Sequence, residues 1–150
     1  MVFTVDPRAS TKRLQRQLEN MIRSLERPRE AHKAASIVMH NFVIRNIDSG
    51  GELVGGWAPL AESTIREKKR IGKSKPMIRS GALRNSFTPF DTDQGGGVRS
   101  ELFYVPFQNF GTRKIPARRL IPNERETLKE VLPIYAAFVK RAAKKAVGIK

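Results

Sequence analysis

The sequence contains no cysteine among its 150 residues. Disulfide bonds, thiolate metal sites and cysteine nucleophiles are therefore excluded, which fits a protein that is assembled in a reducing cytoplasm. Long apolar runs are missing as well, since no stretch approaches the roughly 18 apolar residues that a transmembrane helix needs. Residues 1–7 lack the charged-then-apolar layout of a signal peptide, so we expect a soluble chain without membrane contact.

Acidic residues are scarce. Asp and Glu number 14 against 29 Lys and Arg, which gives a formal net charge of +15. A field of this sign attracts nucleic acid, anionic membranes or acidic protein surfaces by salt-sensitive forces, and it does not choose between them. Many such charges only solvate helix faces. Because hydrophobic residues make up 39% of the chain, the core should be modest and part of the surface should be covered by a partner.

Motifs for catalysis are also lacking. The sequence has no G-x-S-x-G elbow and no phosphate-binding P-loop. His32 and His40 lie too far apart on one predicted helix for a two-histidine metal grip, which favours a structural role. Asp91 and Asp93 form a D-x-D that would suit a metal-dependent nuclease, but Asp is also common in turns. We therefore expect no catalytic, cofactor-binding or metal-binding residues, and a protein that is not an enzyme.

The first part of the chain has the periodicity of helices. From Ser10 onward, apolar residues recur three and four positions apart, which predicts an amphipathic helix with Ser10 or Thr11 as its N-cap. These apolar residues are Leu14, Leu18, Met21 and Leu25. Pro28 suits the first turn of a second helix, which we expect to end near Ile47. The two helices, over about residues 10–47, are predicted to pack as an antiparallel hairpin.

A glycine-rich loop and a basic segment are expected over residues 48–79. The pairs Gly50–Gly51 and Gly55–Gly56 oppose a helix, because glycine loses more backbone freedom in a helix than other residues do. Helical character returns over residues 61–71, where several positive charges crowd together. A second break, over residues 72–76, predicts a basic and mobile loop.

Two strands of a small antiparallel sheet are expected within residues 80–122. The stretches Ser86–Phe90 and Val98–Phe107 are the strand candidates, and the glycines of residues 91–97 predict the hairpin connection between them. Three aromatic residues would then lie along the second strand or near the sheet edge. They are Tyr104, Phe107 and Phe110. A basic loop over residues 113–119 follows.

The last part of the chain, residues 123–147, is predicted to be helical. Asn123 and Glu126 have the spacing of a capping box, and Pro133 should kink the helix or split it. Seven residues should form its core-facing stripe. They are Leu128, Val131, Leu132, Tyr135, Phe138, Val139 and Ala142. The sequence thus predicts a single α+β domain over residues 1–150, with an N-terminal helical hairpin, a small antiparallel sheet and a kinked C-terminal helix.

Four short motifs follow one another in an unusual series. In order they are Trp57-Ala58-Pro59-Leu60, Met77-Ile78-Arg79-Ser80-Gly81-Ala82-Leu83, Tyr104 ahead of Asn109-Phe110-Gly111-Thr112, and Pro116-Ala117-Arg118. The series resembles the phage virion morphogenesis family, which includes tail-completion proteins of P2-like and Mu-like phages. The resemblance spans roughly Trp57 to Ile121 and rests on the order and spacing of the motifs, because no single motif is specific.

Each motif residue also has a physical interpretation of its own. Trp57 can pin the glycine-rich loop to the core while its N–H finds a partner at the edge. Ser80 can cap a short helix that lays Leu83 inward. The motif residues are Trp57, Pro59, Leu60, Ser80, Gly81, Leu83, Tyr104, Phe110, Gly111 and Pro116. Core packing and contacts between subunits both remain open for them. The chain departs from the family pattern at Ser80, at Gln108 and after Arg118, where Arg119-Leu120 replaces a proline and an aromatic residue.

The resemblance implies a structural virion protein at the head–tail junction, as a tail-completion, neck or tail-terminator protein. It implies a homo-oligomeric ring, hexameric by analogy with tail symmetry, with tail-tube and head-connector proteins as partners and genomic DNA passing through the lumen. Its place would be the virion, after assembly in the cytoplasm of a bacterial host. The candidates for contacts with DNA or between subunits are Arg66, Lys68, Lys69, Arg70, Lys73, Lys75, Arg79, Arg113, Lys114, Arg118 and Arg119. The alternative is a stand-alone basic nucleic-acid-binding module.

Overall fold

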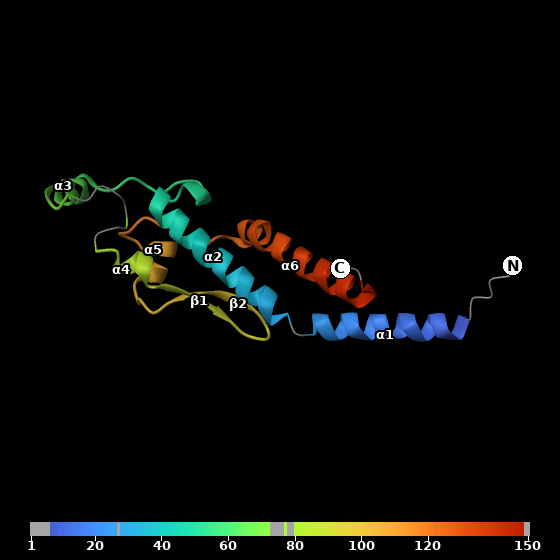
Figure 1. Cartoon of the computed structure of the whole chain (residues 1–150). Helices are drawn as coiled ribbons and strands as arrows, with labels where there is room; N and C mark the ends of the chain where they lie inside the picture. The colour runs from blue at the N-terminus through green and yellow to red at the C-terminus, as the bar shows by residue number, and fades with distance from the viewer. Residues whose placement is uncertain (1–6, 27, 73–76, 78–79, 149–150) are drawn as a thin grey trace.

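The computed structural model describes residues 7–26, 28–72, 77 and 80–148. Its elements, in chain order, are α1 Pro7–Leu25, α2 Arg29–Ser49, the 3₁₀ turn η1 Glu52–Val54, α3 Glu62–Arg70, α4 Ala82–Asn85, β1 Phe87–Asp91, β2 Gly96–Ser100, α5 Val105–Phe110 and α6 Glu124–Val147. The fold is α+β, with one two-stranded antiparallel sheet in the described part of the chain, as the sequence predicts (Figure 1).

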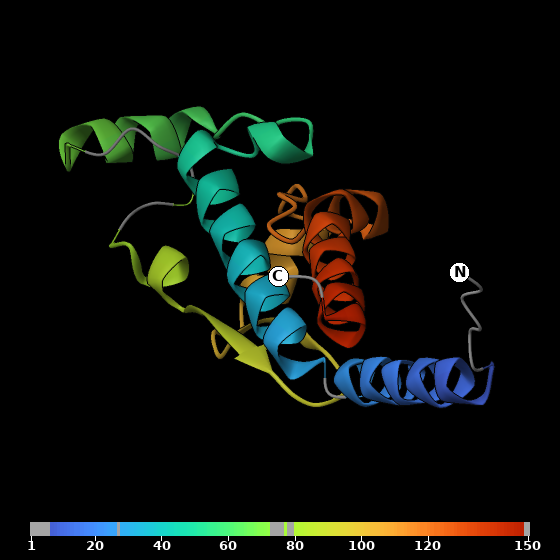
Figure 2. The same cartoon turned by 45° about the vertical axis from the view of Figure 1, so that its right-hand side comes forward.

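Helix α2 runs through the middle of the molecule. The β1–β2 hairpin packs along one side of it and α6 packs along another (Figure 2). Its buried apolar residues, Ala31, Ala35, Phe42, Val43 and Ile47, follow helical spacing and form one apolar stripe. The helix ends where Gly50 takes the left-handed conformation and its N–H bonds the carbonyl oxygens of Asn46 and Ile47, a C-cap for which glycine is the favoured residue.

The hairpin is held closely against α2. Phe87 pairs with Ser100 and Asp91 pairs with Gly96 in antiparallel register. A Cβ on Gly96 would lie 2.4 Å from the carbonyl oxygen of His32, so only glycine permits this approach. His32 Nδ1 lies 2.9 Å from the Thr92 carbonyl oxygen, and His40 Nε2 lies 3.1 Å from that of Phe87. Both histidines therefore tie α2 to the hairpin.

The core is small and lies where α2, the hairpin and the loop before α6 meet. Its buried members are Val43, Ile47, Leu83, Phe87, Val105 and Leu120. Ile47 and Leu120 are fully buried. Trp57, Met77, Val98, Leu102 and Tyr104 pack around this cluster. The core thus joins residues that are far apart in the sequence, including the segment that carries the motif series.

Helix α1 begins earlier than expected and packs elsewhere. It starts at Pro7, a residue well suited to the first helical position, so Ser10 and Thr11 lie inside the helix and neither is its N-cap. The two predicted N-terminal helices are both present, but they do not form an antiparallel hairpin, because α1 leaves the body at an angle to α2 and packs against α6 (Figure 1). Its stripe residues Leu14 and Leu18 are consequently exposed.

Helix α6 begins with the predicted capping box and continues through Pro133. The Asn123 side chain accepts a hydrogen bond from the backbone N–H of Glu126, and the Glu126 side chain accepts one from that of Asn123. The helix is not split at Pro133, and its first and last turns lie along different directions in both views (Figures 1 and 2). The predicted stripe is wrong in part, because three of its residues are exposed although α6 contacts both α1 and α2. They are Leu128, Leu132 and Val139.

The second predicted strand is wrong beyond its first residues. β2 ends at Ser100, and Val105–Phe110 forms α5 with a proline near its N-terminus. Pro106 has no N–H to give to a sheet but fits the first turn of a helix. Phe107 and Phe110 therefore lie on a helix instead of at a sheet edge. Within the described residues, no helix is both long enough and apolar enough to cross a membrane.

Candidate functional site

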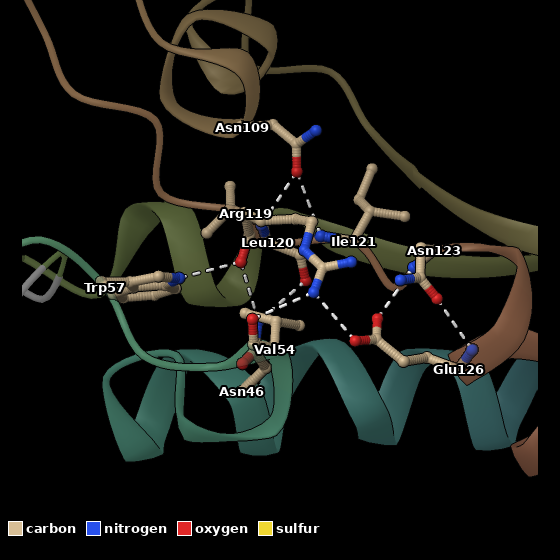
Figure 3. A network of polar contacts seen from close by, with 9 residues as sticks. All are labelled: Asn46, Val54, Trp57, Asn109, Arg119, Leu120, Ile121, Asn123 and Glu126. Atoms are coloured by element: carbon tan, nitrogen blue, oxygen red, sulfur yellow. Dashed lines mark hydrogen bonds and ion pairs between the residues drawn. The ribbon is translucent and has the colours of Figure 1, made fainter.

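Three of the four motifs meet at one short segment, residues 118–121, which precedes α6. We call this segment, together with the side chains that hold it, the motif junction (Figure 3). The holding side chains come from α2, the loop after it, α5 and α6. They are Asn46, Trp57, Asn109 and Glu126. Segments that the sequence placed up to 74 positions apart are thereby joined by hydrogen bonds.

Two buried asparagines satisfy the backbone of the motif junction. Asn46 Nδ2 donates to the carbonyl oxygens of Arg119 and Leu120, at 3.0 and 3.2 Å. Asn109 Oδ1 accepts from the N–H groups of Leu120 and Ile121, at 2.8 and 3.1 Å. The sequence predicts neither role. A signal existed for Asn46, which lies among the apolar stripe positions of α2, where a polar residue points to a buried hydrogen bond.

Trp57 packs against the glycine-rich loop and uses its N–H as a hydrogen-bond donor, as its position in the sequence predicts. Its ring covers Gly51, where a Cβ would lie 2.3 Å from Trp57 Cδ1, and its Nε1 donates to the Arg119 carbonyl oxygen at 2.9 Å. The glycine-rich loop is thereby pinned to the core. Gly51 has a φ of +92°, a conformation that glycine adopts at little cost.

Arg118 and Arg119 have internal roles, unlike the contact role expected for them. Arg118 is buried, and its Nη2 donates to the carbonyl oxygens of Ala58 and Pro59, both at 3.2 Å. Arg119 Nη2 donates to the Val54 carbonyl oxygen at 3.0 Å and pairs with Glu126 at 2.8 Å. The position where the chain departs from the family pattern therefore carries an arginine that links η1 to α6.

The other motif residues lie around the same core. Leu83 is buried, as expected, but the N-cap of α4 is Gly81 and not Ser80, whose Oγ accepts a hydrogen bond from Ala82 N at 3.3 Å. Arg84 forms a bidentate pair with Asp48 at 2.8 and 2.9 Å, which fastens α4 to the end of α2 and raises the pKa of Arg84.

Four further motif positions lie in the loops before α3 and after α5. Gly111 has a φ of +76°, and a Cβ there would lie 2.7 Å from Ala117 N. Leu60 is half-buried, while Pro59 and Pro116 are exposed.

Exposed aromatic residues lie on α5, which also carries Asn109 of the motif junction, and in the turn before it. Phe103, in the turn before α5, and Phe110, at the end of α5, are 81% and 79% exposed, and Phe107, on α5 one turn before Phe110, is half exposed. The Phe103 ring meets that of Tyr104 edge to face, with centroids 5.6 Å apart. We call Phe103, Phe107 and Phe110 the aromatic patch. Large aromatic side chains left this open are typical of contact surfaces.

The basic candidates are dispersed. Arg66, Lys69 and Arg70 are exposed on α3 at one end of the molecule, whereas Lys68 on the same helix is buried (Figure 1). Arg113 and Lys114 are exposed in the loop after α5. Three candidates, and the loop predicted over residues 72–76, fall wholly or mainly outside the described residues. These candidates are Lys73, Lys75 and Arg79.

The acidic and histidine residues considered for metal binding have other contacts. Asp91 and Asp93 lie 3.0 and 3.9 Å from Arg29, and the hydrogen bond and charge of Asp91 raise the pKa of Arg29. His32 meets Tyr135 edge to face, and burial raises the pKa of that tyrosine. Among the described residues, no group of three His, Asp or Glu side chains is placed to hold a metal ion.

The site is therefore a set of side chains that hold backbone segments together, beside an open aromatic surface. Its arginines bind carbonyl oxygens and a carboxylate, and two of its buried polar atoms, Asn46 Oδ1 and Arg118 Nε, have no hydrogen-bond partner among the described residues. In comparisons with protein-family models, curated proteins and solved structures, no significant match to this chain was found.

Proposed function

We propose that this chain is a structural subunit of a phage virion that works at the head–tail junction as part of an oligomeric ring. The motif series over Trp57 to Ile121 motivates the proposal. The aromatic patch is the single observation that carries it, because it lies within that same stretch of chain. Burying three phenylalanines against a neighbour would remove a large apolar area from water.

A second apolar surface supports the ring form of the proposal. Leu14, Leu18 and Ile22 are 50 to 56% exposed and follow one another along α1, away from the aromatic patch. Rings need heterologous interfaces, in which one surface of a subunit meets a different surface of the next. Two separate apolar surfaces on one chain meet that requirement.

Light scattering tests the proposal on the purified chain, alone and after mixing with tail-tube and head-connector proteins from the same genome. We expect an oligomer in one of these conditions. Phe103→Ser together with Phe110→Ser should leave a folded monomer, because both rings are exposed and the core does not use them. Phe90→Ser, at an exposed phenylalanine of β1 outside the patch, is the matched control and should still assemble.

A particle experiment tests the place in the virion. Removing the gene should leave unjoined heads and tails, and supplying the wild-type chain should join them. Normal particles without the chain would refute the proposal, as would a monomer that stays monomeric with every virion protein. A monomer that binds DNA tightly would favour the stand-alone nucleic-acid-binding module instead.

A further inference from the structure

A basic groove lies between α1 and the last turn of α6. It has a volume of about 620 Å³, and residues from both helices line it. The lining residues that matter here are Lys12, Arg13, Arg16, Gln17, Asn20 and Lys145. The groove exists because α1 packs against α6, whereas the sequence predicted that it would pack against α2.

The charge of the groove is uncompensated. Lys12, Arg13, Arg16 and Lys145 are all exposed, and none of them forms an ion pair with a described residue. No carboxylate lines the groove. Elsewhere the chain pairs its arginines where an acid is near, as Arg141 does with Glu30 at 3.5 Å. The four cations of the groove therefore face solvent together, which concentrates positive potential there.

The spacing of these cations along α1 suits a ligand whose negative charges recur at regular intervals. Lys12 and Arg16 lie one helical turn apart, which is about 6 Å along the axis, and Arg23 continues the same face two turns further on. The phosphates of a nucleic acid recur at regular short intervals, and Arg, Lys and the amides of Gln and Asn are their usual partners. Gln17 is an amide in this position.

Helix α1 has an apolar face and a polar face, and each face suits a different kind of ligand. Leu14, Leu18 and Ile22 form the apolar face, whereas the groove is lined by the opposite, polar face. A protein partner would bury the apolar face. The groove has no aromatic lining residue on which a base could stack, so contact with the sugar–phosphate backbone alone is the binding mode that it suits.

We propose that the groove binds the phosphate backbone of nucleic acid without reading its base sequence. The inference rests on the proposed function only in naming the packaged genome as the natural ligand. It assigns the contact to α1 and α6 and not to α3, whose basic residues lie at the other end of the molecule (Figure 1).

Fluorescence anisotropy with short DNA duplexes of unrelated sequence, over a range of salt concentrations, tests the assignment. The combined change Lys12→Gln, Arg13→Gln and Arg16→Gln should weaken binding to all duplexes equally and reduce the slope of log K against log salt by about 3. The matched control is Arg66→Gln, Lys69→Gln and Arg70→Gln on α3, which removes the same charge from exposed residues. Its slope should change by less than about 1.

Two single substitutions on α6 test whether this helix, which forms one side of the groove, contacts the nucleic acid. Lys145→Gln should reduce the salt slope by about 1, whereas Lys140→Gln, an exposed lysine of the same helix outside the groove, should leave it unchanged. Circular dichroism of every variant shows that the fold is kept.

The inference would be overturned by a greater loss in the α3 variant than in the groove variant, by equal losses in both, or by the absence of salt-dependent binding to DNA. Binding of poly-L-glutamate in preference to DNA would assign the groove to an acidic protein and would also overturn it. Light scattering on the same samples separates this inference from the proposed function. Assembly without groove binding refutes the inference alone, and groove binding without assembly refutes the ring alone.

Discussion

Asn46, Asn109 and Trp57 direct their polar atoms at the backbone of one short segment, residues 118–121. Without Asn109, the N–H groups of Leu120 and Ile121 would lose their acceptor at the edge of the core. A buried polar group left without a partner costs about 1–3 kcal/mol, so these side chains fix the segment more strongly than apolar contacts alone would. The segment can then hold Leu120 at the centre of the core.

Two glycines in one loop allow the contribution of the Trp57 contact to be measured. Gly51 and Gly55 have φ values of +92° and +95°, so an alanine at either position strains the backbone by about 1–2 kcal/mol. Only at Gly51 would the new Cβ meet the Trp57 ring, because nothing lies within 4 Å of a Cβ at Gly55. We expect Gly51→Ala to lower the free energy of unfolding by about 1–2 kcal/mol more than Gly55→Ala does, since it also displaces the indole N–H from its partner.

Urea unfolding followed by tryptophan fluorescence measures both effects, because Trp57 is the single tryptophan of the chain. The folded Gly51→Ala protein should emit at longer wavelength than the wild type, and folded Gly55→Ala should not. Equal stability and equal emission of the two variants would show that Trp57 does not pin the loop.

At the scale of elements, the sequence predicted helices well where capping residues or helix-breaking glycine and proline residues mark their ends. Residues 61–71 were expected to be helical and α3 covers Glu62–Arg70, while the capping box at Asn123 starts α6 as predicted. The error at α5 has a local cause as well. The aromatic and β-branched residues before Pro106 favour a strand, but a proline without an N–H disfavours sheet pairing there and fits the first turn of a helix.

Other features of the elements could not be predicted from the sequence. An apolar stripe such as Leu14 and Leu18 shows that a helix has a face to bury, but it does not name the partner. Whether α1 packs on α2 or on α6 depends on contacts between distant segments. The groove between α1 and α6 was therefore hidden, although its lysines and arginines are plain in the sequence. The internal roles of Arg118 and Arg119 were hidden for the same reason.

The capping box gives a prediction at this scale. Asn123→Ala should lower the free energy of unfolding by about 1 kcal/mol, because the N–H of Glu126 loses its acceptor at the start of α6. Asn123→Ser, which can still accept that hydrogen bond, should stay close to the wild type. Urea unfolding of the three proteins checks the order. If the alanine variant were as stable as the wild type, the box would not stabilise α6.

The whole molecule is elongated, with α2 at its centre and α1 and α3 toward opposite ends (Figures 1 and 2). None of the described side chains of α1 is fully buried, whereas α2 contributes Val43 and Ile47 to the core. Stability should therefore be uneven along the chain, because segments with little buried apolar surface open more easily.

Hydrogen exchange measures this unevenness. In the monomer, the amides of α2 around Val43 should exchange only through global unfolding, whereas those of α1 should exchange through local opening at far lower free energy. Assembly or DNA binding should then slow exchange in α1. The double variant Phe103→Ser and Phe110→Ser keeps the chain monomeric for the reference measurement, if the ring is built as proposed. Equal protection of α1 and α2 in the monomer would contradict this picture.

The separation of α1 from α3 by the core bears on how the chain can change over generations. Substitutions at sites that share no neighbours generally have additive effects. Mutations that change the charge of α3 should not alter the binding properties of the groove at α1. Mutations in the groove should likewise not alter α3. Each end can then diverge to suit a new partner while the hydrogen-bonded middle is inherited intact.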